Sequence, residues 1–194
     1  MTDNDIEQLH PSLGKKNDGE PRVYVACLGC YNEGVLHGAW MDTDELESEW
    51  NFGDLREDGS YPMTRCKKLH HEEWAIHDKE YIPCGEHPDI DDLLVVMRAI
   101  EEHGDAFREW YEYNAGHYDD PVEMWEEQYQ GEYDSEKDFA EEWASNCGYL
   151  DPITDGWGRT TSNPLLNYID WDWYWRAELR HSFTYSNGHV WSDY

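Results

Sequence analysis

Residues 88–104 read PDIDDLLVVMRAIEEHG, and they mark the point where the apolar pattern changes from that of strands to that of helices. The apolar residues recur at intervals of three and four, which places them on one face of an amphipathic helix. They are Ile90, Leu93, Leu94, Met97 and Ile100. Gly104 follows directly and supplies a helix stop signal.

The sequence before this helix has the alternation of β-strands. Val23, Val25 and Cys27 alternate with their neighbours and predict a strand over residues 23–28. Residues 32–34, Asn-Glu-Gly, are a turn signal, and residues 35–41 read as the partner strand.

Three further segments complete the N-terminal part. Residues 74–77 are a candidate third strand, and residues 51–71 read as an inserted loop. Residues 1–20 lack periodicity and are expected to form a mobile tail.

The sequence after Gly104 predicts more helices, each with an apolar face. Asp105 begins one helix, Asp120-Pro121 begins a second that Gly131 ends, and Ser135 begins a third. The loop over residues 151–164 precedes an aromatic segment, Asn167 to Leu179, which we predict to be helical. Residues 183–191 contain Asn187-Gly188 between two short strand patterns, the strongest short hairpin signal. Strands followed by helices, then a helix and a hairpin, predict an α+β fold.

Charge and composition exclude several functions. The 194 residues carry 14 basic and 44 acidic side chains, a net charge of −30. Direct nucleic-acid binding is excluded because phosphates are bound by Lys and Arg, and a polybasic membrane anchor is excluded for the same reason. Leu, Ile, Val and Phe make up about 16% of the chain, a level that accompanies disorder. The 11 Trp and 14 Tyr offset this shortage and indicate small aromatic cores.

The acidic residues gather in the predicted helices. Residues 101–142 contain 16 acids and two bases. The acids opposite the apolar faces are Glu101, Glu102, Asp105, Glu109, Glu112, Glu123, Glu126, Glu127, Asp138, Glu141 and Glu142. A solvated or salt-adapted surface is one interpretation. The other is imitation of DNA, since rows of carboxylates on helices approach the charge spacing of phosphates.

The five cysteines, without a visible secretory signal, indicate free thiols in a reducing cytoplasm, and no stretch approaches a membrane span. A zinc site would combine Cys27 and Cys30 with two further ligands, which Cys66, His70, His71 or Cys84 could supply. The strand pattern sends Cys27 and Cys30 to opposite faces unless the chain turns at Gly29, so we expect small buried thiols, with no metal and no cofactor. The sequence contains no phosphate-binding motif and no nucleophile motif. A hydrolase would therefore have to use paired carboxylates as its catalytic groups. We expect instead a protein that is not an enzyme.

Several short sequence motifs resemble those of the ArdA antirestriction family of plasmids, conjugative transposons and phages, and they occur in the same order as in that family. These motifs are Val23–Leu28, Tyr31–Gly34, His37–Trp40, Glu73–Asp78, Glu101–Gly104, Tyr129–Ser135 and Asn167–Trp171 with Arg176. The last falls on the family's antirestriction motif, and the resemblance runs from about residue 22 to residue 191.

The resemblance implies a non-catalytic inhibitor of type I restriction–modification enzymes. Family members resemble bent B-form DNA, occupy the DNA groove of the methyltransferase core, and so block restriction and modification. The implied architecture is elongated, with three small domains in a row and a homodimer formed through the last. Here the domains are residues 21–87, β-rich; residues 88–129, acidic and helical; and residues 130–194, α+β.

The implied motif and dimer residues are Asn167, Tyr168, Ile169, Asp170, Trp171, Trp175 and Arg176. Helical spacing predicts that Tyr168, Trp171 and Trp175 share one face, in the domain core or at the dimer seam. The alternative function is an acidic, zinc-stabilised interaction domain with a different protein partner.

Overall fold

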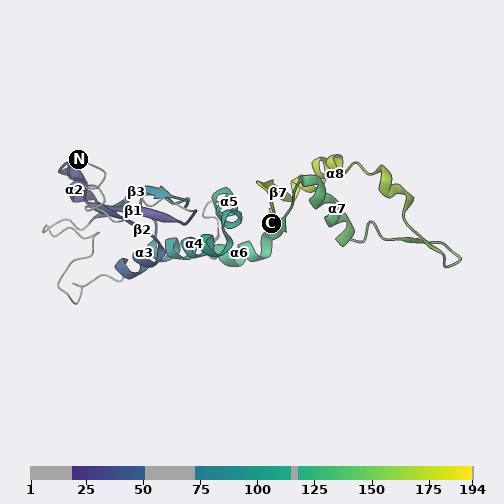
Figure 1. The fold of residues 1–194 in the computed structure, drawn as a ribbon, viewed down its shortest axis with the longest axis horizontal. Helices are drawn as coiled ribbons and strands as arrows, with labels where there is room; N and C mark the ends of the chain where they lie inside the picture. Colours follow the sequence, from purple (N-terminus) through teal and green to yellow (C-terminus); the bar gives the residue numbers. More distant parts are fainter. Residues whose placement is uncertain (1–18, 51–72, 115–117, 194) are drawn as a thin grey trace. The chain divides into compact units, whose positions relative to one another are not determined.

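The computed structural model describes residues 19–50, 73–114 and 118–193 (Figure 1). The expected loop over residues 51–71 and nearly all of the expected tail lie outside these ranges. The described chain is mixed α+β, with three small sheets and seven α-helices. Its contacts divide it into two compact units that adjoin between Val122 and Glu123. None of the helices in the described ranges is long and apolar enough to cross a membrane.

The first unit contains a three-stranded antiparallel sheet in the order β2-β1-β3. Its strands are β1 (Arg22–Cys27), β2 (Gly38–Met41) and β3 (Trp74–Glu80), so the three predicted strands are confirmed in position. Strand β2 begins later than predicted. At its first residue, a Cβ on Gly38 would lie 2.5 Å from the Val25 carbonyl oxygen, so the two strands approach closely there only because this residue is glycine.

Two helices of this unit were not predicted. Helix α2 (Leu28–Asn32) follows β1 directly, so the chain leaves the strand one residue earlier than the alternation indicated. Helix α3 (Thr43–Trp50) follows β2 and packs against α4. Both are short, and α2 spans little more than one turn, which leaves no helical periodicity to detect.

The two long helices of this unit confirm the sequence prediction. Helix α4 (Ile90–His103) is capped by Asp89, whose side chain accepts hydrogen bonds from two backbone N–H groups, and Gly104 ends it with a φ of 66°. Helix α5 (Asp105–Asn114) follows at once and buries Phe107 and Trp110 completely. These aromatic rings fill the interior that the scarce aliphatic residues leave open.

One predicted helix end is wrong, at the start of the second unit. Helix α6 (Pro121–Gln128) begins as predicted, but it ends three residues before Gly131, and β4 (Tyr129–Glu132) follows. Strand β4 pairs with β8 (His189–Ser192), which pairs in turn with β7 (Phe183–Ser186). The distant β8 supplies hydrogen-bond partners that outweigh the local helical pattern.

The predicted hairpin is confirmed. Asn187 and Gly188 have positive φ values of 46° and 93°, as a two-residue turn of the hairpin type requires. The predicted loop before it contains one small ladder, β5 (Ile153–Thr154) with β6 (Thr160–Thr161).

An aromatic core holds this unit together. Helix α7 (Glu136–Asn146) is capped by Ser135, as predicted, and turns Phe139 inward. The rings of Trp175 and Phe183 meet that of Phe139 at centroid distances of 5.9 Å and 5.0 Å, nearly edge to face. The buried members of this core are Phe139, Ala140, Trp175, Leu179, Phe183 and Val190.

The predicted helix over residues 167–179 is divided into three pieces. They are the 3₁₀ turn η1 (Pro164–Tyr168), helix α8 (Trp171–Ala177) and the 3₁₀ turn η2 (Leu179–His181). The break lies at Asp170, whose side chain caps α8 by accepting a hydrogen bond from the Trp173 N–H at 2.9 Å. Tyr168 therefore precedes α8 and does not share a helical face with Trp175, contrary to the prediction.

Truncation of Trp175 tests the aromatic core. We expect Trp175→Ala to cost about 3–5 kcal/mol of the stability of the second unit, because a buried ring is replaced by a cavity. Trp173→Ala is the matched control: it lies in the same helix but is 59% exposed, and its cost should stay within about 0.5 kcal/mol.

Hydrogen exchange read by mass spectrometry locates the effect. Amides of β4, β7 and β8 should lose protection in Trp175→Ala, while those of β1 and β3 keep theirs. Equal losses in the two variants would contradict this assignment of the core.

Candidate functional site

Eleven carboxylates form the acidic set predicted from the sequence, and all lie on described helices. Ten are exposed, whereas Glu109 is half-buried, with 13% of its side chain accessible. The set occupies the end of α4 and the outer faces of α5, α6 and α7. Its members are Glu101, Glu102, Asp105, Glu109, Glu112, Glu123, Glu126, Glu127, Asp138, Glu141 and Glu142.

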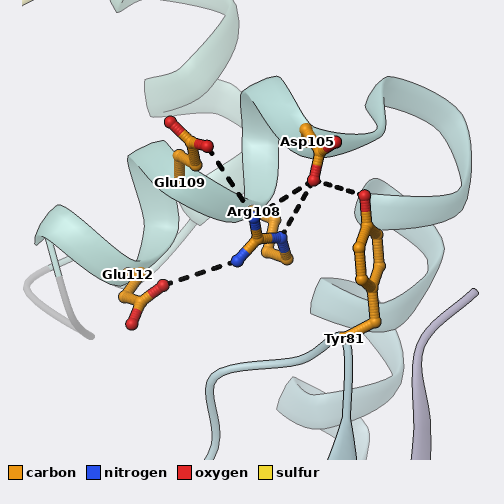
Figure 2. A network of polar contacts seen from close by, with 5 residues as sticks. All are labelled: Tyr81, Asp105, Arg108, Glu109 and Glu112. Carbon is orange, nitrogen blue, oxygen red and sulfur yellow. Dashed lines mark hydrogen bonds and ion pairs between the residues drawn. The ribbon is translucent and has the colours of Figure 1, made fainter. Parts of the chain in front are cut away.

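Three members of the set surround one guanidinium (Figure 2). Arg108 Nε and a terminal nitrogen donate to Asp105 Oδ1 at 3.2 Å and 3.1 Å. The same guanidinium lies 3.7 Å from a Glu109 oxygen and 3.6 Å from a Glu112 oxygen. Tyr81 donates its hydroxyl hydrogen to Asp105, and its ring lies 4.9 Å below the Arg108 guanidinium.

This network compensates the acids of α5. Burial raises the pKa of Tyr81, and the hydrogen bond to Asp105 raises it further, so the phenol stays a neutral donor. Burial opposes the charge of Arg108, but its contacts with Asp105 and Tyr81 outweigh that effect, so the pKa of the guanidinium is raised. One positive charge thus offsets part of the charge on three carboxylates.

The acids of α6 and α7 are in a different electrostatic setting. Within the described ranges, Glu126, Glu127 and Glu141 form no ion pair and are exposed. Asp138 accepts a hydrogen bond from the Ser135 hydroxyl at 2.7 Å, and Glu142 lies 3.4 Å from the Tyr133 hydroxyl. Neutral hydroxyl donors leave the negative charge of a carboxylate uncompensated. These five acids of α6 and α7 therefore have no cation beside them within the described ranges.

The acidic set predicted from the sequence leaves out three acids of the first unit. Asp92, Asp119 and Asp120 line a pocket of the first unit together with Val95, Val96, Tyr111, Tyr118 and Pro121. Asp92 lies in the first turn of α4 next to its cap, where acids favour helix formation, and the sequence could have indicated it on that ground.

The residues of the expected antirestriction motif are placed in three environments. Tyr168 is 83% exposed, Asn167 and Arg176 are exposed, and Trp175 is buried. Ile169 and Trp171 are half-buried, and Asp170 is the exposed cap of α8. The segment therefore combines a core anchor with exposed aromatic and polar groups.

The candidate metal ligands come together only in part. Cys27 and Cys30 lie close to each other and to His37, a residue that the sequence analysis did not include. Cys84 lies outside this group; burial raises the pKa of its thiol, and nearby Lys79 opposes the shift. Cys66 lies outside the described residues.

A comparison with models of protein families shows to which family this chain belongs. The family model described as antirestriction protein (ArdA) matches residues 23–190, most of both units. The chain belongs to the ArdA antirestriction family. No individual curated protein matches it. Antirestriction proteins of the ArdA family are inhibitors and not enzymes.

Replacement of Arg108 tests the network of Figure 2. We expect Arg108→Gln to lower the free energy of unfolding by about 1–2 kcal/mol, because three neighbouring carboxylates lose their shared cation and repel one another. The control is Arg98→Gln, which removes a single exposed pair with Glu47 and should cost about 0.5 kcal/mol or less.

Denaturant titrations at low and high salt measure both variants. The difference between them should shrink as salt rises, because mobile ions screen the repulsion. An Arg108→Gln variant as stable as Arg98→Gln at low salt would contradict a role for this network.

Proposed function

We propose that this protein inhibits type I restriction–modification enzymes by presenting carboxylates where DNA presents phosphates. The observation that carries the proposal is the acidic set: exposed carboxylates on successive helices whose opposite faces are buried, in a chain of the ArdA family. The target is the methyltransferase core, whose DNA groove the protein occupies, and both restriction and modification stop because both need that groove.

The spacing of the acids suits this mechanism. Residues three or four apart on a helix are separated by about 4.5–6 Å along its axis, while B-form DNA has one phosphate per about 3.4 Å along each strand. Rows of acids on several helices raise the charge density further. A groove that releases counterions when it binds phosphates gains the same free energy from carboxylates placed along it.

The proposed function also implies a domain arrangement, an oligomeric state and a cellular location. The protein is an elongated homodimer of three-domain chains, joined through the C-terminal domain, and it acts in the cytoplasm of a bacterial host. Tyr168 and Trp173, which precede the buried Trp175 in the chain, are exposed and support a contact surface on this part of the chain. Trp175 serves the core of its own unit.

The acids are not equivalent under this mechanism. Glu126, Glu127 and Glu141 present full charges, whereas Asp105, Glu109 and Glu112 share Arg108. A basic groove should therefore gain more from the first three residues than from the second three, although each trio carries the same formal charge.

Two triple variants test the proposal with matched charge. Glu126→Gln, Glu127→Gln and Glu141→Gln together should weaken binding to a purified type I methyltransferase at least tenfold and leave stability unchanged. Asp105→Asn, Glu109→Gln and Glu112→Gln together should weaken binding less and lower stability, because Arg108 loses all three partners. Binding isotherms at several salt concentrations supply the affinities.

The salt dependence gives a second criterion. The parent's affinity should fall steeply with salt, and the first triple variant should show the shallower slope. Equal effects of the two trios, or a flat salt response in the parent, would contradict phosphate mimicry. A single acid whose loss abolishes all activity would indicate a hydrolase.

A further inference from the structure

Two thiols and an imidazole gather at the end of β1. Cys27, Cys30 and His37 each offer one ligand atom, and these three atoms lie within 4.8 Å of one another. The Cys30 Sγ is 3.6 Å from the His37 Nδ1. Both cysteines are 98% buried, and the imidazole is half-buried. No acidic residue belongs to this group within the described ranges.

The backbone brings these side chains together. Strand β1 ends at Cys27 and α2 begins at Leu28, so the chain turns at the position where a continued strand would have sent the two thiols to opposite faces. The Cys30 N–H points at the Cys27 Sγ at a distance of 3.4 Å. The Cys27 N–H donates to the His37 carbonyl at 2.8 Å, which fixes the third residue beside the first.

We propose that Cys27, Cys30 and His37 bind one zinc ion at the β1–α2 turn. This site is separate from the acidic set and does not depend on the proposed function.

The distances suit zinc. A tetrahedral ion with a Zn–S bond of about 2.3 Å and a Zn–N bond of about 2.0–2.1 Å holds a sulfur and a nitrogen ligand about 3.6 Å apart. The sulfur and nitrogen of Cys30 and His37 already have this separation. The Cys30 N–H directed at the Cys27 sulfur holds this second sulfur in place beside the first.

The ligand types select the metal. Thiolates and an imidazole prefer zinc over the hard cations that 44 carboxylates attract elsewhere on the chain. Three protein ligands leave the fourth tetrahedral position to a water molecule, which reaches the site from the half-buried side of His37. Binding releases the two thiol protons and links the end of β1 to the residue just before β2.

Cobalt serves as the spectroscopic probe for this site. The reduced full-length protein, stripped of metal, is titrated with Co²⁺ and then with Zn²⁺. We expect one Co²⁺ per chain, with a thiolate-to-cobalt charge-transfer band and the visible bands of tetrahedral coordination, and we expect Zn²⁺ to bleach both. This readout distinguishes the site from carboxylates, which bind Co²⁺ through oxygen and give no thiolate band.

Variants assign the ligands. Cys30→Ser and His37→Gln should each weaken cobalt binding by more than ~100-fold, the upper range for loss of an outer-shell partner. Cys30→Ser should also halve the charge-transfer intensity at saturating Co²⁺, whereas His37→Gln should retain it. Cys84→Ser and Cys147→Ser are the controls, since both thiols lie outside the group, and they should bind as the parent does.

His37→Gln keeps the test decisive if Cys30→Ser fails to fold, because its side chain is only half-buried. The absence of a thiolate band in the parent would overturn the proposal. So would unchanged affinity in His37→Gln, or loss of the band in Cys84→Ser or Cys147→Ser.

Discussion

Repulsion among carboxylates is the constraint under which this chain folds. The surface of this protein carries a net charge of −30 on 194 residues, while its interior has few aliphatic side chains to stabilise the fold. Two unit charges 6 Å apart repel by about 0.7 kcal/mol in water. Helices α5, α6 and α7 each carry two pairs of acids three or four residues apart within the acidic set. Buried aromatic rings provide the opposing stabilisation. Phe107 and Trp110 in the first unit, and Phe139, Trp175 and Trp191 in the second, are almost inaccessible to solvent. Each removes on the order of 150–250 Å² from water.

Under the proposed function, the same constraint sets stability against binding along the acidic set. Arg108 relieves repulsion on α5 at the expense of the negative field that a DNA-binding groove would recognise. Glu126, Glu127 and Glu141 have no such partner within the described residues. A mimic of DNA needs this arrangement, because carboxylates that are fully paired with cations present no net charge to a partner.

The sequence predicted those elements whose signals are local. Gly104 ends α4, and Asn187-Gly188 forms the hairpin turn, because helix ends and turns depend on the residues that form them. Strand β4 was missed because its partner, β8, lies about 60 residues further along the chain. The break at Asp170 was missed because an aromatic run has the same composition on either side of a cap.

In the candidate site, too, features with local signals could be predicted and contacts between distant segments could not. The exposure of most of the acidic set could be predicted because it follows from helical period. The contact of Arg108 with Tyr81 could not, because it brings α5 against the residue that follows β3, more than 20 positions earlier in the chain. His37 escaped the metal analysis because only the turn into α2 brings it beside two thiols that strand geometry would separate.

Competition between this protein and a DNA duplex for one purified type I methyltransferase tests the central claim most directly. If the protein occupies the DNA groove, binding is mutually exclusive, and the apparent Kd for DNA rises linearly with the concentration of the protein without a limit. A ternary complex of enzyme, DNA and this protein, or an apparent Kd that reaches a plateau, would contradict the account.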